Sequence, residues 1–503
     1  MGKITEIYLL STPFTMKQNE TILFQNKTLQ YQYMASCIKH SYTNFSIQRQ
    51  NRSIKVPDFI EDIFDTNYLM YRNNTNGKWY YCFITSYNYI NDNCTEITFV
   101  FDVLQTYQFN YTVKPSFVER EHVNNDTIGS NTIDEGLSIG ETKLIDKNVI
   151  TGLTNFRYIV ATTYGTEIKD DVIVPKYKGT KRNGIYSSLE MLVFNNSEIE
   201  SMANLINEIE AKKEGAIQYI AVVPSFALES STVDGNIVYA SNEISSKEIT
   251  VPFAFDSIDG YIPNNNKLFC YPYNSLIISN SNGTENLLKF ENFSDRENIT
   301  FKFFASLGAN CTVKICPKNY KNVTVNFEES INLEGYPQCE FTTSNFSNWL
   351  SSSFMNVGTN ILSTALQVYT GNEWGAIGTG IETVKSATQS LLKSDNVKGN
   401  NSTGSLSLLA KSDFKFYHQQ IKSEYARAID EFFSRYGYKV NRVKLPNHTG
   451  RENYNFIKTQ NCLCVGDIPS TDLEEIQSIY DKGITFWHNS SNFGNYTVTN
   501  NIV

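Results

Sequence analysis

Short runs rich in aromatic and β-branched residues, separated by Asn-rich turns, recur along most of this 503-residue chain. Examples are ITEIYLL and EITFVFDVLQTYQF near the start, and LFCYPYNSLIIS and ITFKFFAS further on. Such runs favour strands, and Asn favours the turns between them. Their regular spacing is typical of β-sandwiches or barrels. A chain of this length allows about three or four domains. The sequence therefore predicts a multi-domain, mainly β fold with some α.

Changes in this pattern divide the chain into four segments. Residues 1–145 are expected to form an N-terminal β-rich domain, and residues 146–340 β-rich middle domains with one helix. Residues 341–412 are apolar, poor in charge and end in the linker-like NVKGNNSTG. Residues 413–503 are expected to form a C-terminal unit of helices and strands.

Apolar residues spaced three or four apart predict helices over 197–215, 414–437 and 471–483. Gly437 and Gly483 are suited to end the second and third. Thr471 and Glu474 have the spacing of a capping box at the start of the third. The apolar face of the second helix would consist of Tyr417, Ile421, Tyr425, Ile429, Phe432 and Tyr436.

The charge balance limits the partners that the chain can bind. Its formal net charge is −9, and it has no block of Lys or Arg. This argues against a protein that holds nucleic acid by neutralising phosphates. It is compatible with a channel through which nucleic acid slides, because an acidic lumen repels phosphates.

No pattern of catalytic or metal-ligating residues stands out. The five His lack metalloprotease spacing, and there is neither a G-x-S-x-G motif nor a phosphate-binding loop. The nine Cys lack the spacing of a disulfide framework or a zinc site, which favours buried reduced thiols. Cys462 and Cys464 would share one face of a strand. We expect no enzyme, no catalytic residue, no cofactor and no metal.

The sequence FVEREHV places acidic and basic residues side by side at 119–122. Adjacent side chains of a strand point to opposite faces, so these would not converge as an acid and base pair. A structural ion-pair network is the better interpretation. A carboxylate pair for glycoside hydrolysis needs only to meet in space, but nothing in the sequence indicates one.

The N-terminus lacks the layout of a signal peptide, and no run of 18 apolar residues exists for a conventional membrane span. The missing signal disfavours a secreted pore-forming toxin.

The segment from Phe341 to Asn372 carries no charge over 32 positions. One interpretation is a helix buried in a core or oligomer interface. The other is membrane activity: a helix from Trp349 to Tyr369 would span roughly 30 Å, close to a bilayer core. Several copies could shield its polar groups from lipid. The candidate membrane-active residues are Trp349, Leu350, Phe354, Met355, Val357, Ile361, Leu362, Leu366 and Trp374, with the tryptophans at interfacial positions.

Motifs at both ends of the chain resemble the tail knob, or distal tail tube, protein of small short-tailed phages of Gram-positive bacteria (Picovirinae-type podophages). Near the start these are YLLSTPF, the run from DVLQTYQF to KPSFVEREHVNND, and NTIDEGLSIGE. Near the end they are YGYKVNRVKLPN, RENYNFIKT, GDIPSTDLEEI and GITFWHNSSNFGNY. The middle, about 146–340, matches only in its β-rich character.

The resemblance implies a homohexameric tube at the tail tip, made in the host bacterial cytoplasm, through which phage double-stranded DNA leaves the capsid. Residues 1–145 and 413–503 would build the tube. Apolar loops would plug its lumen and then penetrate the host cell membrane, and 341–412 lies where such a loop belongs. The implied protein partners are the proximal tail, or lower collar, protein and other tail-tip proteins.

A receptor-binding or cell-wall-degrading phage tail protein is the alternative. A degrading enzyme would need convergent carboxylates or a metal site in a cleft. A receptor-binding protein would need an exposed groove of aromatic and polar residues in the middle domains.

Overall fold

The computed structural model describes residues 5–147 apart from 17–19, 44–51 and 75–76, residues 149–340 with short gaps, and residues 414–503. The segment 341–412, with all nine candidate membrane-active residues, lies outside the described residues. The chain forms two compact units. The first contains Met1–Glu141, Ser257–Cys270 and Lys422–Val503, and the second contains Thr142–Asp256 and Tyr271–Ile421. The four segments predicted as domains stay a prediction.

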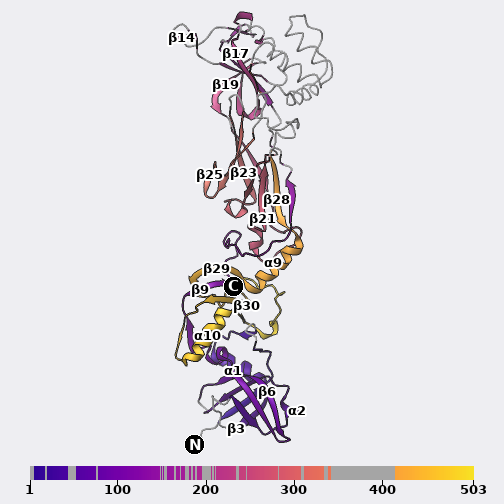
Figure 1. Cartoon of the computed structure of the whole chain (residues 1–503), viewed down its shortest axis with the longest axis vertical. Helices are drawn as coiled ribbons and strands as arrows, with labels where there is room; N and C mark the ends of the chain where they lie inside the picture. Colours follow the sequence, from indigo (N-terminus) through magenta and orange to yellow (C-terminus); the bar gives the residue numbers. More distant parts are fainter. Residues whose placement is uncertain are drawn as a thin grey trace. The chain divides into compact units, whose positions relative to one another are not determined.

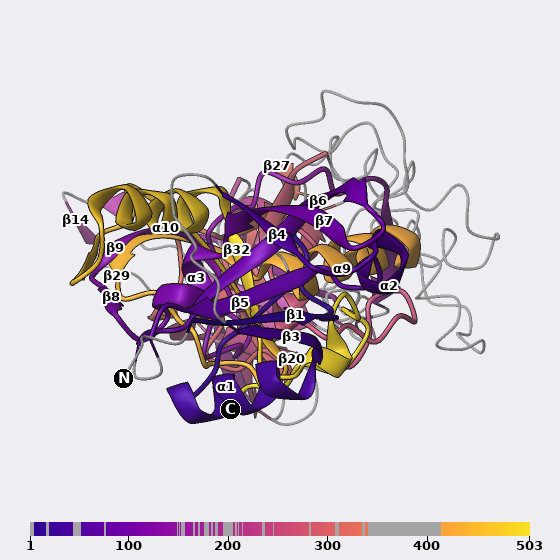
Figure 2. The ribbon, with the colours of Figure 1, turned by 90° about the horizontal axis from the view of Figure 1, so that it is seen from below.

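A six-stranded antiparallel sheet begins the first unit, with the order β3-β1-β5-β6-β7-β4. Figure 2 shows β1, β3 and β5 side by side. Alternation along the strands buries Ile7 and Leu9 in one apolar cluster and Leu10 in another, which also contains Met34 of the first helix. The elements are β1 (Glu6–Leu10), β3 (Ile38–Thr43), β4 (Ser53–Val56), β5 (Tyr68–Arg72), β6 (Tyr80–Asn91), β7 (Cys94–Phe101), α1 (Lys27–Ser36) and α2 (Ile60–Ile63).

A second sheet of this unit joins strands from both ends of the chain, in the order β2-β32-β30-β9-β29. Only β2 and β32 pair in parallel. Apolar residues of α10 pack with α3 and β30 in one cluster that includes Leu104, Ile457 and Ile476. The elements are β2 (Thr21–Ile22), α3 (Val103–Tyr107), β8 (Tyr111–Val113), β9 (Ser116–Glu121), α9 (Ser423–Tyr436), β29 (Tyr438–Lys444), β30 (Tyr454–Gln460), β31 (Cys464–Gly466), α10 (Ser470–Lys482) and β32 (Ile484–Trp487), with 3₁₀ turns η3 (Asn266–Phe269) and η5 (Ser490–Asn492).

The second unit is also built mainly from antiparallel sheets, in the orders β18-β19-β16-β11-β17-β27, β10-β28-β21-β22 and β20-β23-β24-β25, with β26 beside β24. One apolar core includes residues of all three sheets, among them Ile220, Leu276 and Phe301. The elements are β10 (Thr142–Lys147), β11 (Phe156–Thr162), β12 (Thr166–Lys169), β13 (Val172–Pro175), β14 (Lys181–Arg182), β15 (Ile185–Tyr186), β16 (Glu190–Phe194), β17 (Ile217–Pro224), η2 (Ser225–Ala227), β18 (Leu228–Val233), β19 (Ile237–Ile244), β20 (Ser246–Pro252), β21 (Asn274–Ser279), β22 (Glu285–Leu288), η4 (Phe290–Asn292), β23 (Asn298–Ala305), β24 (Val313–Tyr320), β25 (Val323–Val325), β26 (Ile331–Leu333), β27 (Gln338–Glu340) and β28 (Lys415–Ile421).

The predicted mainly β fold with few helices is confirmed (Figure 1). The helix predicted over 414–437 is wrong before Ser423, because Lys415–Ile421 forms β28 between β10 and β21. Pairing on both edges of β28 outweighs the local helical spacing. The capping box at Thr471 is also wrong: α10 starts one residue earlier, and Pro469 is its N-cap. Gly437 and Gly483 do end their helices, with φ of +62° and +96°.

The helix predicted over 197–215 is confirmed where the structure describes it. Residues 205, 206, 209 and 211–212 are helical. The side chains of Leu205, Ile206 and Ile209 are buried in the core of the second unit, as the predicted apolar face requires.

Candidate functional site

The charged residues of β9 bind partners on neighbouring elements of the first unit. Glu119 pairs with Lys458 of β30 at 2.8 Å. Glu121 pairs with Lys444 of β29 and also accepts a hydrogen bond from the backbone of Asn447 at 2.9 Å. The two partners are on the strands at either edge of β9, and Arg120 pairs with Glu135. The ion-pair network predicted for 119–122 is therefore confirmed for Glu119, Arg120 and Glu121, whereas His122 takes no part in it.

A buried carboxylate anchors the loop that follows β9. Glu135 pairs with Arg120 and Lys267, and it accepts a hydrogen bond from the backbone N–H of Lys439 at 3.0 Å. Burial lowers the pKa of Lys267, and the hydrogen bond from its ammonium to Glu135 opposes that shift. Each oxygen of the carboxylate has a cationic partner, so Glu135 is suited to holding the loop in place and not to catalysis.

His122, directly after β9, is fixed at both ring nitrogens. Its Nδ1 accepts a hydrogen bond from the backbone N–H of Phe456 at 2.8 Å, which leaves the proton on Nε2 for the carbonyl of Ser434 at 3.2 Å. Burial, reinforced by the positive charge of Arg451, lowers the pKa of His122 to about 3. The imidazole is neutral at ordinary pH and has no free nitrogen with which to act as a base.

Two further carboxylates hold the segment 264–266 against α9 and the chain after β9. Asp430, fully buried in α9, accepts hydrogen bonds from the backbone N–H groups of Asn264 and Asn265 at 2.8 and 3.0 Å. Asp126 accepts from the backbone N–H of Asn266 at 3.1 Å and from the hydroxyl of Tyr438 at 2.5 Å. Burial raises the pKa of Asp126, and these hydrogen bonds oppose the increase.

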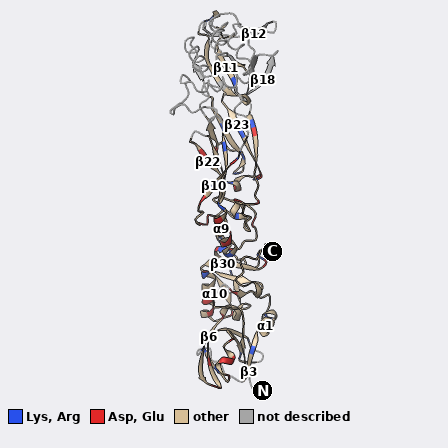
Figure 3. Cartoon of the chain, turned by 90° about the vertical axis from the view of Figure 1, so that its right-hand side faces the viewer, with Lys and Arg blue, Asp and Glu red and all other residues tan. Residues whose placement is uncertain are grey.

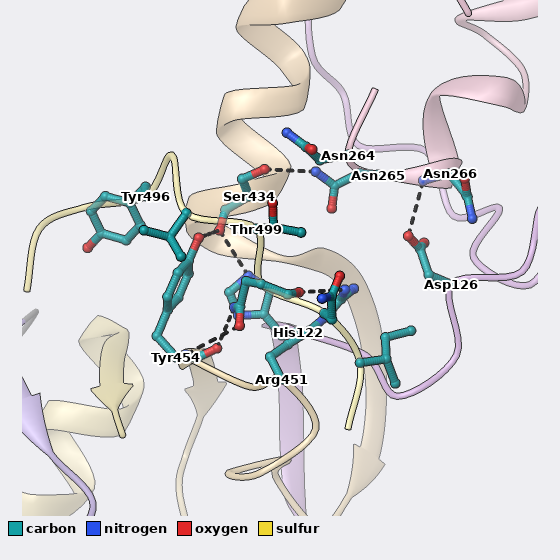
Figure 4. Close-up of a pocket in the computed structure, with 14 residues that line it drawn as sticks. His122, Asp126, Asn264, Asn265, Asn266, Ser434, Arg451, Tyr454, Tyr496 and Thr499 are labelled. Carbon is teal, nitrogen blue, oxygen red and sulfur yellow. Dashed lines mark hydrogen bonds between the residues drawn. The ribbon is translucent and has the colours of Figure 1, made fainter. Parts of the chain in front are cut away.

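His122, Asp126 and the segment 264–266 line part of a cavity of about 260 Å³ in the first unit. Figure 4 shows His122, Arg451 and Tyr454 on one side of it and Asn264 to Asn266 near the end of α9. The C-terminal segment 498–502 completes the lining. The lining residues come from positions far apart in the sequence, and only His122 was singled out by sequence reasoning. The other lining residues, many of them Asn or aromatic, form no contiguous motif that could have identified them from the sequence.

In the part of the chain that the structure describes, two cysteines lie together, but metal-ligating side chains do not cluster. No group of three His, Cys, Asp or Glu side chains there is placed to hold a metal ion. Cys462 and Cys464 share a face, as predicted, with their sulfurs 3.6 Å apart. Their mutual hydrogen bond raises the pKa of the Cys464 thiol and lowers that of the Cys462 thiol. Cys464 is therefore held protonated, and Cys462 is the more acidic thiol of the pair.

Charged residues are sparse along the described ribbon, which is mostly tan in Figure 3. Among the helices that the structure describes, none is long and apolar enough to cross a membrane.

Comparisons with known proteins place the chain in a family. Residues 238–501, more than half of the chain, match the family model of the C-terminal domain of the tail knob protein gp9 of Bacillus phage phi29. The chain belongs to the phage tail knob protein family. Residues 3–112 match a second family model, the N-terminus of the caudoviral major tail protein.

Tail knob proteins from two phages align with nearly the whole chain. Tail knob protein gp9 of Bacillus phage B103 is 24% identical, over 99% of this chain and 98% of its own length. Tail knob protein gp9 of Bacillus phage phi29 is 25% identical, over 98% of each chain. The resemblance that the motifs at both ends indicated is therefore confirmed.

A solved structure has the same fold. The tail knob protein gp12 of bacteriophage C1 superposes with a TM-score of 0.66 at 16% identity, over 99% of this chain and 100% of that one. Family membership makes the chain a structural component of the phage tail, in agreement with the predicted location in the virion.

Proposed function

We propose that six copies of the chain form the distal tube of a short phage tail, through which double-stranded DNA leaves the capsid. The observation that carries this proposal is the alignment with tail knob proteins over nearly the full length of both chains. The joining of N-terminal and C-terminal strands in one sheet, β2-β32-β30-β9-β29, supports a wall unit built from both ends of the chain. The proximal tail protein and other tail-tip proteins are its proposed neighbours in the virion.

An exposed apolar edge in the first unit supports assembly with further copies. Strand β29 is at the end of its sheet; Val443 in this strand is 69% exposed, and Leu445, directly after it, is 57% exposed. Leu463 and Val465 are 55% and 50% exposed. Ser116 of β9 pairs with Lys444, and its hydroxyl accepts a hydrogen bond from the backbone N–H of Leu463. The exposed residues 443 and 445 therefore lie near the same end of β9 as the exposed residues 463 and 465. An edge strand with exposed apolar side chains is suited to pairing with another chain.

The segment 341–412 is proposed as the plug of the lumen and the membrane-penetrating element. Its first 32 residues carry no charge, which removes the main cost of entering lipid. The proposal rests on the sequence of the segment and its place between the two β-rich parts of the chain.

Native mass measurement and negative-stain imaging of the purified full chain test the tube. We expect a ring of six with a central channel, formed without metal or nucleotide. A stable monomer at micromolar concentration and above would contradict the proposal. Cleavage of purified host cell wall by the chain alone, lost on substitution of one carboxylate, would instead support the wall-degrading alternative.

A further inference from the structure

A buried guanidinium without a carboxylate partner lines the cavity of the first unit. Arg451 is 7% exposed, and its Nη1 donates a hydrogen bond to the carbonyl of Asn500 at 3.3 Å. Its Nε is buried and has no hydrogen-bond partner. Among the described residues, no carboxylate oxygen lies within the 4.0 Å of an ion pair with Arg451. A buried cation that is neither paired nor fully hydrogen-bonded is strongly unfavourable, so this group calls for an anion.

Among the described residues, no charged or titratable group around the cavity forms an ion pair with Arg451. Asp126 also lines it, but both of its oxygens are engaged, by the hydroxyl of Tyr438 and the backbone of Asn266. Asp430 accepts its hydrogen bonds from Tyr261, Asn264 and Asn265. Burial and the charge of Arg451 keep His122 neutral, and both of its ring nitrogens are engaged in hydrogen bonds. The positive charge of Arg451 counteracts the rise in the pKa of Asp126, so the two charges attract each other across the cavity lining. None of the described carboxylates, however, forms an ion pair with Arg451.

The size and lining of the cavity suit a small, hydrogen-bonding ligand. Its volume of about 260 Å³ is just below the ~300–1,000 Å³ of pockets for drug-sized molecules. Side chains that can donate hydrogen bonds line it beside Arg451; they include Asn264, Asn266, Thr499 and Asn501. The planar guanidinium of an arginine matches the geometry of an oxoanion, which it can bind through two parallel hydrogen bonds.

We propose that this cavity binds a small tetrahedral oxoanion of the phosphate or sulfate type, with Arg451 as its principal ligand. The anion is either free or the terminal group of a larger molecule, since both offer the same charged oxygens to the guanidinium. This site does not include the segment 341–412, because every residue that lines it belongs to the first unit.

Titration calorimetry and thermal unfolding of the full chain test the proposal. Inorganic phosphate or sulfate should raise the melting temperature more than sodium chloride at equal ionic strength. Glycerol phosphate distinguishes the sources: tighter binding than inorganic phosphate indicates an ester, and weaker binding indicates the free ion. Equal effects of phosphate and sodium chloride would show only screening and overturn the proposal.

Substitutions at Arg451 test whether its guanidinium binds the anion. Arg451→Met should weaken phosphate binding by about tenfold to a hundredfold, the value of a hydrogen bond to a charged group. In phosphate-free buffer it should melt no lower than the parent, because it removes an unpaired buried charge. With phosphate present, the parent should melt at a higher temperature than Arg451→Met. Arg427→Met is the matched control, since Arg427 is an exposed arginine of α9 with its guanidinium 5.5 Å from the Tyr261 ring centre.

Arg451→Lys keeps the proposal testable if the Met variant does not fold. Lysine retains the charge but not the planar pair of donors, so phosphate should bind about tenfold more weakly than to the parent. If Arg451→Lys binds phosphate as tightly as the parent, or if Arg427→Met loses as much affinity as the Arg451 variants, the cavity is not the anion site.

Discussion

Burial decides the protonation of the histidines more strongly than any neighbouring charge. Desolvation is the largest cause of the lowered pKa values of His122, His418 and His448, which fall to about 3, 4 and 4. Each of the three rings also contacts an aromatic side chain edge-on or at a tilt. A histidine that is neutral when folded and protonated when unfolded makes stability depend on pH, and the sign follows from which state binds the proton.

The pH dependence of unfolding should become smaller in His122→Gln. The unfolded chain takes up a proton near the ordinary histidine pKa of 6.5, and the folded chain does so only near 3. His122 therefore stabilises the fold above pH 6.5, and this contribution falls by about 2 kcal/mol between pH 7 and pH 5. Glutamine can accept from Phe456 and donate to Ser434 without titrating.

Urea denaturation at pH 7 and pH 5, for the parent and His122→Gln, measures this effect. Between pH 7 and pH 5, the free energy of unfolding of the parent should fall by about 2 kcal/mol more than that of the variant. An equal loss in both proteins would show that His122 is not buried in its neutral form.

At the scale of elements, the passage from α9 to β29 depends on one glycine. Gly437 has φ of +62° and ψ of −153°, a region open almost only to glycine, and it ends α9 directly before β29 starts at Tyr438. A Cβ at this position would lie 2.1 Å from the carbonyl oxygen of Glu121. The helix end and the sheet thus approach each other too closely for any side chain.

Gly437→Ala should therefore lower the free energy of unfolding by at least about 2 kcal/mol, from backbone strain and the clash with Glu121. Gly494→Ala is the control, because Gly494 also has positive φ, of +73°, but a Cβ added there would meet no atom within 4 Å. Chemical denaturation of both variants separates the two causes. Equal losses would mean that backbone strain alone accounts for the effect.

At the scale of the whole molecule, assembly and membrane activity are assigned to different parts of the chain. The exposed apolar edge of Val443, Leu445, Leu463 and Val465 belongs to the first unit. The charge-free run from Phe341 to Asn372 lies outside it in the sequence. Variants can therefore alter one property and leave the other unchanged.

The double variant Val443→Lys with Leu445→Lys should shift the hexamer toward smaller species, because charges would be buried against each other at every subunit boundary. Val323→Lys, at a residue 45% exposed in the second unit, is the control and should leave assembly unchanged. Sedimentation velocity with the parent alongside measures the outcome. A hexamer of parental stability in the double variant would place the interface elsewhere.

Deletion of 341–412 should leave hexamer formation intact and abolish the release of dye from liposomes. Lysine substitutions at Leu350, Phe354 and Ile361 should weaken release with little effect on assembly, since a charge at the bilayer centre costs about 3 kcal/mol. Parental dye release by the deletion variant would refute the membrane role. Failure of the deletion variant to fold would favour a buried core helix.

Local patterns in the sequence determined the class of the fold and the C-terminal ends of α9 and α10. The alternation that buries Ile7 and Leu9 on one face of a strand can be recognised from adjacent residues of the sequence. Gly437 and Gly483 end their helices through their own backbone angles, which is also a local property. The motifs at both ends were sufficient for the family, because each is a contiguous stretch of sequence.

Only the tertiary structure decided which distant segments meet. Lys415–Ile421 has the apolar spacing of a helix but is a strand, because β10 and β21 supply backbone partners on both of its edges. The cavity likewise combines His122, Asn265, Arg451 and Asn500, which no local period connects. Strand pairing and the burial of charge depend on contacts between residues hundreds of positions apart, and a local pattern carries no record of them.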